Sequence, residues 1–387
     1  MYSICRLLTL QPVIQQLLRR QFAHSHKYKN EFFQKKWINK KIKPTEKLRW
    51  GIAPISLMGD DFATALSALP KKHHKLVACV ASYKSCAKAF AQKHDVPKIY
   101  TSFYDLAKNK HIDVVYISPL NSQHLELSTV MMQHGKHVLC EKPLCTTEEQ
   151  AIELIGNSHR EGRFLMEGMW SRFLPGYEYV RKQIRNSALG EIYEVNCTYG
   201  VDTKKSDRFI KHIFGNGVTL DLGIYPIQLA QWVYRMPPYH ILAKGLVDKD
   251  GIDVEAKINL DYCCGRKAVI DISANVDHEN LALIKGTKGK ITIPNYWCPT
   301  KIIDVDGSEK LFPLPQSDRQ TIFPNRVALC YQAEEVRRCL MNRKNQSELM
   351  SHNETLLISK IVDQVRRQLG ADFPEDDDNL LNYEGHQ

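Results

Sequence analysis

Four short apolar runs, separated by stretches with helical spacing, constrain the first half of this chain more than any other feature. The runs are Leu48–Ala53, Lys75–Ala81, Val114–Ser118 and Lys136–Cys140. The centre of the second run is entirely apolar, which is typical of a strand buried on both faces. Because such strands alternate here with helices, we predict an α/β domain with a parallel, doubly wound sheet.

The last of these runs ends in Glu141-Lys142-Pro143. Proline stops a strand and stiffens the turn that follows, so we expect Lys142 to be held at the carboxyl end of a strand. Ligands of open α/β sheets bind at that edge. Taken alone, the same residues also fit a charged pair in a surface turn.

The second half of the chain predicts an α+β domain with a large, mostly antiparallel sheet. Its β-runs are Ile192–Tyr199, His240–Val247, Glu255–Asp261, Ala268–Val276 and Leu281–Pro294, and two amphipathic helices, Tyr331–Met341 and Glu348–Leu369, follow them. A length of 387 residues also suits two domains. We therefore place one domain at 48–165 and a second domain at 166–373.

Most of the positive charge lies at one end of the chain. Residues 1–47 hold eleven basic and two acidic residues (11 − 2 = +9), and the whole chain carries +10. The remaining body is nearly neutral, which excludes a basic surface for nucleic acid. Residues 374–387 form an acidic tail that we expect to be frayed.

The first thirty residues have the composition of a mitochondrial transit peptide. They contain Arg6, Arg19 and Arg20, leucines at helical spacing, and no acidic residue before Glu31. Their apolar runs are too short and interrupted for a membrane span. We expect residues 1–47 to be a basic presequence and linker. The alternative is a disordered basic tail on a cytoplasmic protein.

The chain has eleven cysteines, an odd number, and no Cys-x-x-Cys pair. Most of them lie inside apolar runs, where cysteine behaves as a small hydrophobic residue. We therefore expect reduced thiols, without a disulfide framework or a metal site.

The turn after the first strand lacks the usual dinucleotide fingerprint, G-x-G-x-x-G, and has Pro54-x-Ser56-x-x-Gly59 in its place. Pro54 has no N–H to donate. Ser56 adds a side chain where the backbone should approach the pyrophosphate, although its hydroxyl could donate to a phosphate. Asp60 adds a negative charge beside the expected phosphates.

The end of the second strand is also unusual. It offers neither an acidic residue for a ribose 2′-OH nor an arginine for a 2′-phosphate. Ser82 and Lys84 are the polar residues there that could partly serve the 2′-phosphate.

Asp221-Leu222-Gly223-Ile224-Tyr225 is the second candidate for chemistry. On a helix, Asp221 and Tyr225 are four residues apart and share a face. A tyrosine near a lysine can serve as a general acid or base, because the ammonium favours the phenolate. Spacing alone favours another interpretation, in which Asp221 is an N-cap beside a packed aromatic ring.

Several motifs, in this order along the chain, resemble the Gfo/Idh/MocA oxidoreductases, the family of glucose–fructose oxidoreductase and inositol dehydrogenase. The motifs are the strand-turn-helix start, Phe90–Lys98, the loop Ser118-Pro119-x-Asn121-x-x-His124, Val138–Pro143, Phe164–Pro175, Leu220–Tyr225, Gly286–Gly289 and Trp297–Thr300. The resemblance extends from about residue 48 to about residue 373.

The resemblance implies that residues 48–165 form a Rossmann-type, dinucleotide-binding domain. It implies that residues 166–373 form a substrate and dimerisation domain, whose sheet buries its open face in a homodimer. It implies hydride transfer to NADP, with NAD as the alternative, from a hydroxyl carbon of a cyclic diol or aldose (trans-dihydrodiol or D-xylose type). Tyr225 would take the hydroxyl proton with help from Lys142, and Asp221 would orient the substrate or the tyrosine. The cofactor-binding positions would be Ile55, Ser56, Leu57, Met58, Ser82, Ser118, Pro119, Asn121, His124, Glu141, Lys142, Trp170 and Arg172.

Two readings of the function remain at this point. The first is an active dehydrogenase, which depends on the presence of Lys142, Asp221 and Tyr225. The second is a weak or inactive relative that acts as a cofactor sensor or a structural dimer, as the altered Pro54–Gly59 turn indicates. For His124, the alternative to a place in the cofactor cleft is a cap of the following helix. Neither reading requires a membrane or nucleic acid.

Overall fold

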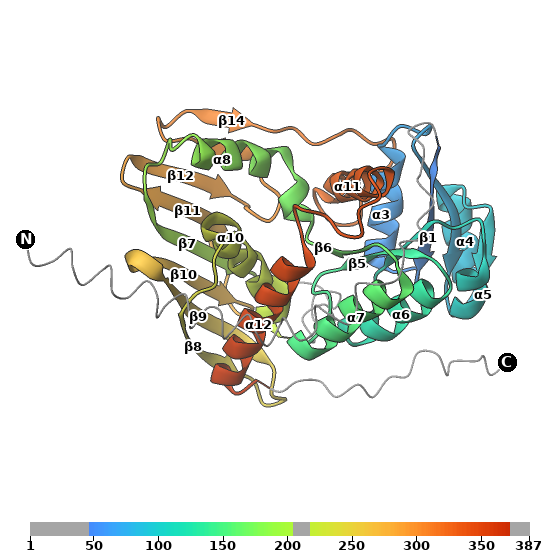
Figure 1. The fold of residues 1–387 in the computed structure, drawn as a ribbon, viewed down its shortest axis with the longest axis horizontal. Coiled ribbons are helices and arrows are strands. Elements are labelled where there is room, and N and C mark those ends of the chain that lie inside the picture. Colours follow the sequence, from blue (N-terminus) through green and yellow to red (C-terminus); the bar gives the residue numbers. More distant parts are fainter. Residues whose placement is uncertain (1–45, 204–216, 372–387) are drawn as a thin grey trace, which may run out of the picture.

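The computed structural model describes residues 46–203 and 217–371 (Figure 1). The predicted presequence, apart from its last two residues, and the predicted acidic tail lie outside these ranges.

The first sheet has six strands, all parallel, in the order β3-β2-β1-β4-β5-β6. The strands are β1 (Leu48–Ala53), β2 (His74–Val80), β3 (Lys98–Tyr100), β4 (Val114–Ile117), β5 (His137–Glu141) and β6 (Leu165–Gly168). This confirms the predicted doubly wound sheet. The chain reverses direction across the sheet between β1 and β4, so the loops after β1, β4 and β5 meet at one crevice.

Helices cover both faces of this sheet, which explains why its central strands are mostly apolar. They are α3 (Leu57–Ser67), α4 (Lys84–His94), α5 (Phe103–Lys108), α6 (His124–Gln133) and α7 (Glu148–Glu161). Phe62 and Phe90 of α3 and α4 belong to one hydrophobic core, and Leu106, Met131 and Leu154 of α5, α6 and α7 belong to another. The sheet therefore separates two cores.

The second sheet has eight strands in the order β14-β13-β12-β11-β7-β10-β9-β8. They are β7 (Ile192–Gly200), β8 (His240–Val247), β9 (Asp253–Tyr262), β10 (Arg266–Ser273), β11 (Leu281–Gly286), β12 (Gly289–Pro294), β13 (Lys301–Ile303) and β14 (Glu309–Leu311). Among the strands of this sheet in the described residues, only β7 and β10 pair in parallel. The prediction of a mostly antiparallel sheet is confirmed.

One predicted strand was wrong in its extent. The run Leu281–Pro294 is a hairpin of β11 and β12 that turns at Thr287 and Lys288. Gly286 touches the carbonyl of Leu189 so closely that a side chain would collide with it, and Gly289 has a φ of +148°. Glycine at these two positions permits the turn. Strands β13 and β14 are additions to the predicted set.

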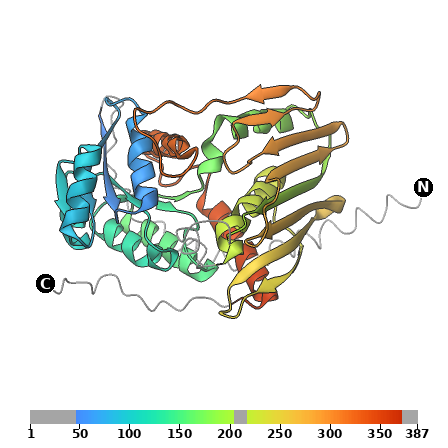
Figure 2. The ribbon, with the colours of Figure 1, turned by 180° about the vertical axis from the view of Figure 1, so that it is seen from behind.

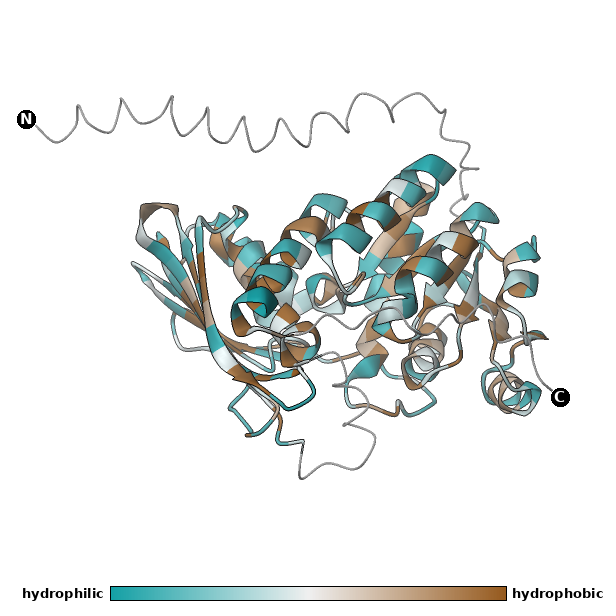
Figure 3. Cartoon of the chain, turned by 90° about the horizontal axis from the view of Figure 1, so that it is seen from below, coloured by the Kyte–Doolittle hydropathy of each residue, from teal (hydrophilic) through white to brown (hydrophobic). Residues whose placement is uncertain are grey.

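Three helices lie across one face of the second sheet (Figure 1): α8 (Pro175–Arg185), α10 (Ile224–Tyr234) and α12 (His352–Leu369). Every residue of α10 is buried. In the opposite view, these helices lie behind the strands of the second sheet (Figure 2). Apolar and polar residues alternate along the strands (Figure 3), because one face packs on helices and the other does not.

The two domains share elements at their junction. Strand β6 belongs to the first sheet, so the predicted boundary at residue 165 falls at the start of a strand. Helix α11 (Leu329–Met341) comes from the end of the chain and packs on α3. The backbone N–H of Glu148 on α7 also donates to Asp363 on α12 (2.8 Å). The C-terminal helices therefore hold the nucleotide-type domain against the second sheet.

Ten of the eleven cysteines lie within the described residues, and all ten are free thiols. In the same residues, no helix has the length and apolar content needed to cross a bilayer.

Candidate active site

Lys142 lies at the carboxyl end of β5 and reaches into the second domain. Its Nζ donates to the main-chain oxygen of Asp221 (3.0 Å) and lies 3.8 Å from the carboxylate Oδ1 of the same residue. The same ammonium lies 5.3 Å from the centroid of the Tyr225 ring. The side chain is only 14% exposed, so it is not part of a charged pair in a surface turn.

The turn that carries Lys142 is held from two sides. His124 Nδ1 donates to the carbonyl of Pro143 (2.9 Å), and the carboxylate of Glu167 accepts from Leu144 N–H (3.1 Å) and from the Thr355 hydroxyl (2.8 Å). Burial lowers the pKa of His124 to about 4 and raises that of Glu167 to about 7. His124 is therefore neutral at pH 7 and supports the Lys142 turn. Its ring does not cap α6.

Asp221 lies in a π-helical turn, Thr219–Gly223, that leads into α10. The carboxylate of Asp253, at the start of β9, accepts from the Thr219 N–H (2.7 Å) and the Thr219 hydroxyl (2.5 Å). Gly217 precedes the turn with a φ of +90°, and a side chain there would collide with Asp253. Wide turns of this kind often mark functional sites. Asp253 is absent from the residues predicted from the sequence, because no motif surrounds it.

The carboxylate of Asp221 is incompletely satisfied. Its Oδ2 atom is buried and has no hydrogen-bond partner in the structure. Burial raises the pKa of Asp221 to about 6, although Lys142 acts in the opposite direction. A buried acceptor without a donor costs free energy, and a hydroxyl of a bound ligand would satisfy this one.

Tyr225, at the second position of α10, is only 3% exposed. Its phenol oxygen accepts from the indole N–H of Trp170 (2.9 Å), which lies in the 3-10 turn Trp170–Phe173 after β6. The Tyr199 ring lies 6.0 Å from the Tyr225 ring and stacks on Trp297 at 4.3 Å. The site therefore joins an ammonium, a carboxylate and a phenol, and aromatic rings border it.

The altered turn after β1 keeps part of a phosphate cradle. Ser56 is the N-cap of α3: its hydroxyl accepts from Gly59 N–H (2.9 Å) and lies 2.9 Å from the Ser118 hydroxyl. The Ile55 N–H donates to the carbonyl of Val80 (2.8 Å). The N–H groups of Ser56, Leu57 and Met58 have no partner among the described residues. A helix N-terminus with free N–H groups can bind a phosphate, so this turn still fits a dinucleotide.

The negative charge of Asp60 is balanced away from that cradle. Its carboxylate pairs with Lys93 (2.6 Å) and lies 3.2 Å from the His94 ring, both on α4. The expected repulsion of a phosphate is thereby reduced.

Glu141 is buried at the end of β5, and its Oε1 accepts from the phenol of Tyr116 (2.6 Å). The Tyr116 ring stacks on Phe62 of α3 at 3.9 Å. Ser118, Pro119 and Asn121 follow β4 on the adjoining loop. Ser82 and Lys84 are exposed after β2. Apart from Arg172, the predicted positions therefore lie along the crevice edge or join the Lys142 cluster.

The structure does not bring the guanidinium of Arg172 to this cluster. It donates to the side-chain and main-chain oxygens of Gln228 (2.9 and 3.2 Å), to Glu354 (2.8 Å) and to Leu349 O (3.3 Å). The reason is geometric: with about three residues per turn in a 3-10 helix, positions two apart point in different directions. Trp170 therefore faces Tyr225, while Arg172 joins α10 to α12.

Phe323 and Arg326 also belong to the site, although no motif indicated them. Arg326 begins the 3-10 turn Arg326–Ala328, and its guanidinium lies 4.5 Å from the centroid of the Trp170 ring. The carboxylate of Asp61 on α3 holds the preceding segment by accepting from the N–H groups of Ile322 (2.5 Å) and Phe323 (3.1 Å). In the described part of the chain, no cluster of three or more His, Cys, Asp or Glu could hold a metal.

Comparisons with known proteins identify the family of this chain. Residues 48–169 match the model of the Gfo/Idh/MocA oxidoreductase family with an NAD-binding Rossmann fold, and residues 177–292 match the Gfo/Idh/MocA C-terminal domain. A trans-1,2-dihydrobenzene-1,2-diol dehydrogenase of Xenopus tropicalis is 37% identical over 328 residues, which is 84% of this chain and 99% of the relative. The protein of the same name from Homo sapiens is 34% identical over 331 residues, covering 85% and 99%.

Solved structures share the fold. The aldose-aldose oxidoreductase of Caulobacter crescentus, complexed with glycerol, superposes with a TM-score of 0.70 at 21% identity, over 83% of this chain and 97% of that one. A 3-ketoreductase from Actinomadura kijaniata, in complex with NADP and TDP-benzene, gives 0.70 at 21% identity over 84% and 98%. Given both family-model matches and these relatives, the chain belongs to the Gfo/Idh/MocA oxidoreductase family.

Proposed function

We propose that this protein is an NADP-dependent dehydrogenase that oxidises a hydroxyl carbon of a small cyclic diol or aldose, of the trans-dihydrodiol or D-xylose type. The observation that carries the proposal is the junction of Lys142, Asp221 and Tyr225 at the mouth of the nucleotide crevice. The names of the curated relatives support a trans-dihydrodiol as the substrate.

The substrate hydroxyl lies between Lys142 and Tyr225 in this mechanism. The Tyr225 phenolate accepts the hydroxyl proton, and the Trp170 indole N–H together with the Lys142 ammonium stabilises that phenolate. A bound nicotinamide would accept the hydride from the carbon that carries this hydroxyl. The free Oδ2 of Asp221 accepts from a neighbouring substrate hydroxyl and orients the ring.

Three groups of residues would hold the cofactor. The free N–H groups of Ser56, Leu57 and Met58 suit the pyrophosphate. Glu141 suits a ribose hydroxyl, because a carboxylate can accept further donors beside Tyr116. The exposed Ser82 and Lys84 are the groups available for a 2′-phosphate, which favours NADP over NAD only modestly.

A weak or inactive relative that senses cofactor is the second candidate, and one observation favours it. The Ser56 side chain occupies the turn that glycine keeps open in the usual fingerprint, and it is already bonded to Gly59 and Ser118. This candidate function predicts that the protein binds cofactor without turnover, or that it shows neither cofactor binding nor turnover.

Titration of the full-length protein with NADPH, and separately with NADH, distinguishes the candidates. We expect micromolar binding of NADPH, followed by turnover in a screen of pentoses and trans-dihydrodiols. Tyr225→Phe serves as the control that binds cofactor and has a strongly reduced turnover, and Lys142→Ala is a second variant with reduced turnover. Absence of NADPH and NADH binding up to millimolar concentration would refute the dehydrogenase, while binding without turnover of any substrate would favour the sensor.

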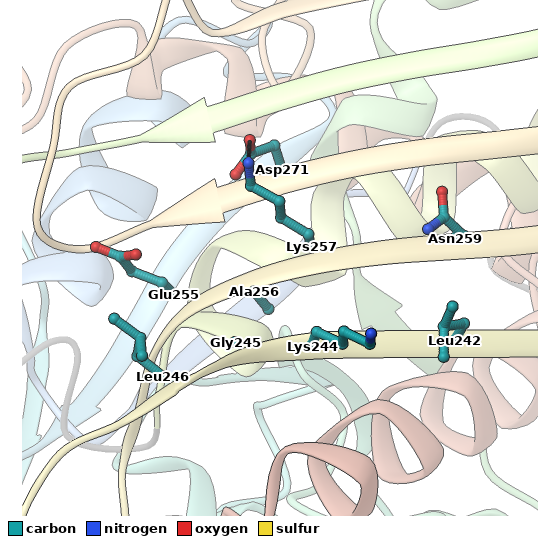
Figure 4. Close-up of a pocket in the computed structure, with 9 residues that line it drawn as sticks. All are labelled: Leu242, Lys244, Gly245, Leu246, Glu255, Ala256, Lys257, Asn259 and Asp271. Atoms are coloured by element: carbon teal, nitrogen blue, oxygen red, sulfur yellow. Dashed lines mark ion pairs between the residues drawn. The ribbon is translucent and has the colours of Figure 1, made fainter.

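We propose further that the open face of the second sheet forms a homodimer. Side chains from β8, β9 and β10 stand on this face around a shallow hollow (Figure 4). The hollow combines exposed Leu242 and Leu246 with charges of both signs, including Lys257 paired with Asp271 (3.5 Å). Such a mixture can complement a second copy of itself across a two-fold axis.

Sedimentation equilibrium tests the dimer, with Leu246→Glu as the variant that places a new charge on the hollow. We expect a dimer for the wild type and a monomer for this variant. A monomeric wild type at micromolar concentration contradicts the proposal.

For localisation, we propose the mitochondrion, because of the basic, acid-poor first thirty residues. A fusion of residues 1–47 to a fluorescent protein tests this proposal in cells. Import followed by removal of the segment supports it, and a cytoplasmic signal contradicts it.

A further inference from the structure

Arg326 places a second cation beside the residues proposed for catalysis. Its guanidinium lies over the Trp170 ring, at 4.5 Å from the centroid, and 6.0 Å from the centroid of the Phe323 ring. The edge of the same Trp170 donates to the phenol oxygen of Tyr225. Arg326 also interacts electrostatically with the phenol of Tyr225, the carboxylate of Glu141 and the phenol of Tyr199. It therefore faces the space where the mechanism above places the substrate.

The position of Arg326 is fixed by its own segment. Asp61 is fully buried on α3 and accepts from two backbone N–H groups just before Arg326, those of Ile322 and Phe323. Asn325 has a φ of +65° and turns the chain into the 3-10 helix that Arg326 begins. The first domain therefore fixes the backbone before Arg326, while the guanidinium lies between the two domains.

The guanidinium has no hydrogen bond or ion pair within the residues that the structure describes. The carboxylates of Glu141 and Asp61 interact with it electrostatically but form no ion pair with it, and Asp61 accepts from the backbone instead. A guanidinium that stacks on an indole keeps its N–H donors in its own plane, along its edge. Those donors match the two oxygens of a carboxylate, which arginine binds in bidentate fashion.

We propose that Arg326 is a specificity-determining residue that binds a carboxylate group on the substrate. The preferred substrates are then hydroxy acids of the sugar-acid class, such as a uronate, in which a carboxylate lies on the same small molecule as the hydroxyl to be oxidised. This inference rests on the proposed dehydrogenase function and narrows its substrate class from neutral diols and aldoses to carboxylated ones.

The direct test compares two sugars that differ only in the carboxylate, D-glucuronate and D-glucose. Saturation-transfer NMR on the full-length protein, with both sugars in one tube, measures binding without any need for turnover. We expect a signal from D-glucuronate that exceeds the signal from D-glucose. Arg326→Met should reduce the affinity for D-glucuronate by about 10- to 100-fold, which is the range for loss of a charge-assisted hydrogen bond, and leave D-glucose unchanged.

Arg319→Met is the matched control. Arg319 lies on the same connecting segment, pairs with the exposed Asp95 (2.9 Å), and loses the same charge in this substitution. We expect it to bind D-glucuronate as the wild type does. Equal binding of the two sugars by the wild type, or an unchanged D-glucuronate signal in Arg326→Met, would overturn the inference.

The NADPH titration of the same three proteins separates this inference from the proposed function. If none of them binds NADPH while D-glucuronate still depends on Arg326, the dehydrogenase fails and the carboxylate site stands. If all three proteins bind NADPH with equal affinity but none binds D-glucuronate, the proposed dehydrogenase function is retained and the inference about Arg326 fails. A change in NADPH affinity confined to Arg326→Met, without sugar selectivity, would overturn the inference and make Arg326 a cofactor contact.

Discussion

The crevice has a chemical end, with the residues proposed for catalysis, and a nucleotide end, formed by the turn after β1. The first keeps the residues that a dehydrogenase needs, and the second keeps only part of them. At the chemical end, Lys142, Asp221, Tyr225 and Trp170 are joined by direct contacts. At the nucleotide end, Pro54 and Ser56 replace residues that would let the backbone approach a pyrophosphate. The difference teaches that chemistry and cofactor affinity are separable properties here, because different segments of the chain supply them. The experiments below break or sharpen that separation.

Tyr225→Phe should produce the largest effect at the chemical end. Removal of the general base is expected to lower kcat by roughly 10²- to 10⁴-fold, while NADPH affinity stays within about twofold of the wild type. Steady-state kinetics and cofactor fluorescence measure the two quantities on the same sample. A comparable loss of NADPH affinity would show that the two ends are coupled after all.

The charge state of Asp221 should make stability depend on pH. Burial raises its pKa to about 6 from 3.8, so the folded protein holds the proton more tightly than the unfolded chain does. The free energy of unfolding therefore falls as pH rises from about 4 to about 6. Asp221→Asn has no carboxyl group to titrate at this position. Its free energy of unfolding should therefore rise relative to that of the wild type by up to about 3 kcal/mol between the lower and the upper end of that pH interval.

Urea unfolding of Asp221→Asn and the wild type, at pH values near the two ends of that interval, measures the difference. Glu167, whose pKa is raised to about 7 by burial, contributes to both proteins and cancels. A stability difference that does not change with pH would contradict the raised pKa of Asp221.

Asp253→Ala should destabilise the chemical end through the π-helical turn. The substitution leaves the buried Thr219 N–H and hydroxyl without their acceptor, which we expect to cost roughly 2–3 kcal/mol of unfolding free energy. Turnover should fall too, because the turn positions Asp221. Chemical denaturation and activity at a temperature below unfolding test both effects. NADPH binding retained with full activity would show that the turn tolerates the loss.

Ser56→Gly should act only at the nucleotide end. Glycine restores the close approach of the backbone to a phosphate, so we expect NADPH to bind up to about tenfold more tightly, a gain of roughly 1.4 kcal/mol. As an N-cap, glycine costs only a few tenths of a kcal/mol relative to serine, roughly 0.3 kcal/mol. Ser56→Ala is the control, since it removes the cap without opening the turn. Weaker NADPH binding in Ser56→Gly would mean that the serine hydroxyl itself holds the phosphate.

Local pattern predicted much of the fold. Strand β1 has the predicted bounds, and the run before Glu141 ends in a turn that presents Lys142, as its proline indicated. The hairpin of β11 and β12 was harder, because Gly286 and Gly289 interrupt a run whose apolar content continues across them. Alternation describes which face a strand buries, and it does not show where the chain reverses.

The candidate site was predictable only where a motif stood next to it. The motifs indicate Lys142, Asp221 and Tyr225. They place Trp170 with the cofactor, whereas its indole N–H donates to Tyr225. Arg172 was assigned to the same cleft, yet it joins α10 to α12, because side-chain direction in a 3-10 turn follows its pitch. Asp253, which fixes the turn of Asp221, lies 34 residues from its partner Thr219 without any motif around it.

By itself, the sequence determined the alternation of strands and helices, the position of a lysine at a strand end, and the family. These properties depend on backbone geometry and on the burial of one face of each element, which neighbouring residues decide. The tertiary structure alone decided that Arg326 lies over Trp170 and that Asp61 anchors the Arg326 segment. Those contacts join segments that are more than a hundred residues apart, so they form only when both domains have packed and closed the intervening chain.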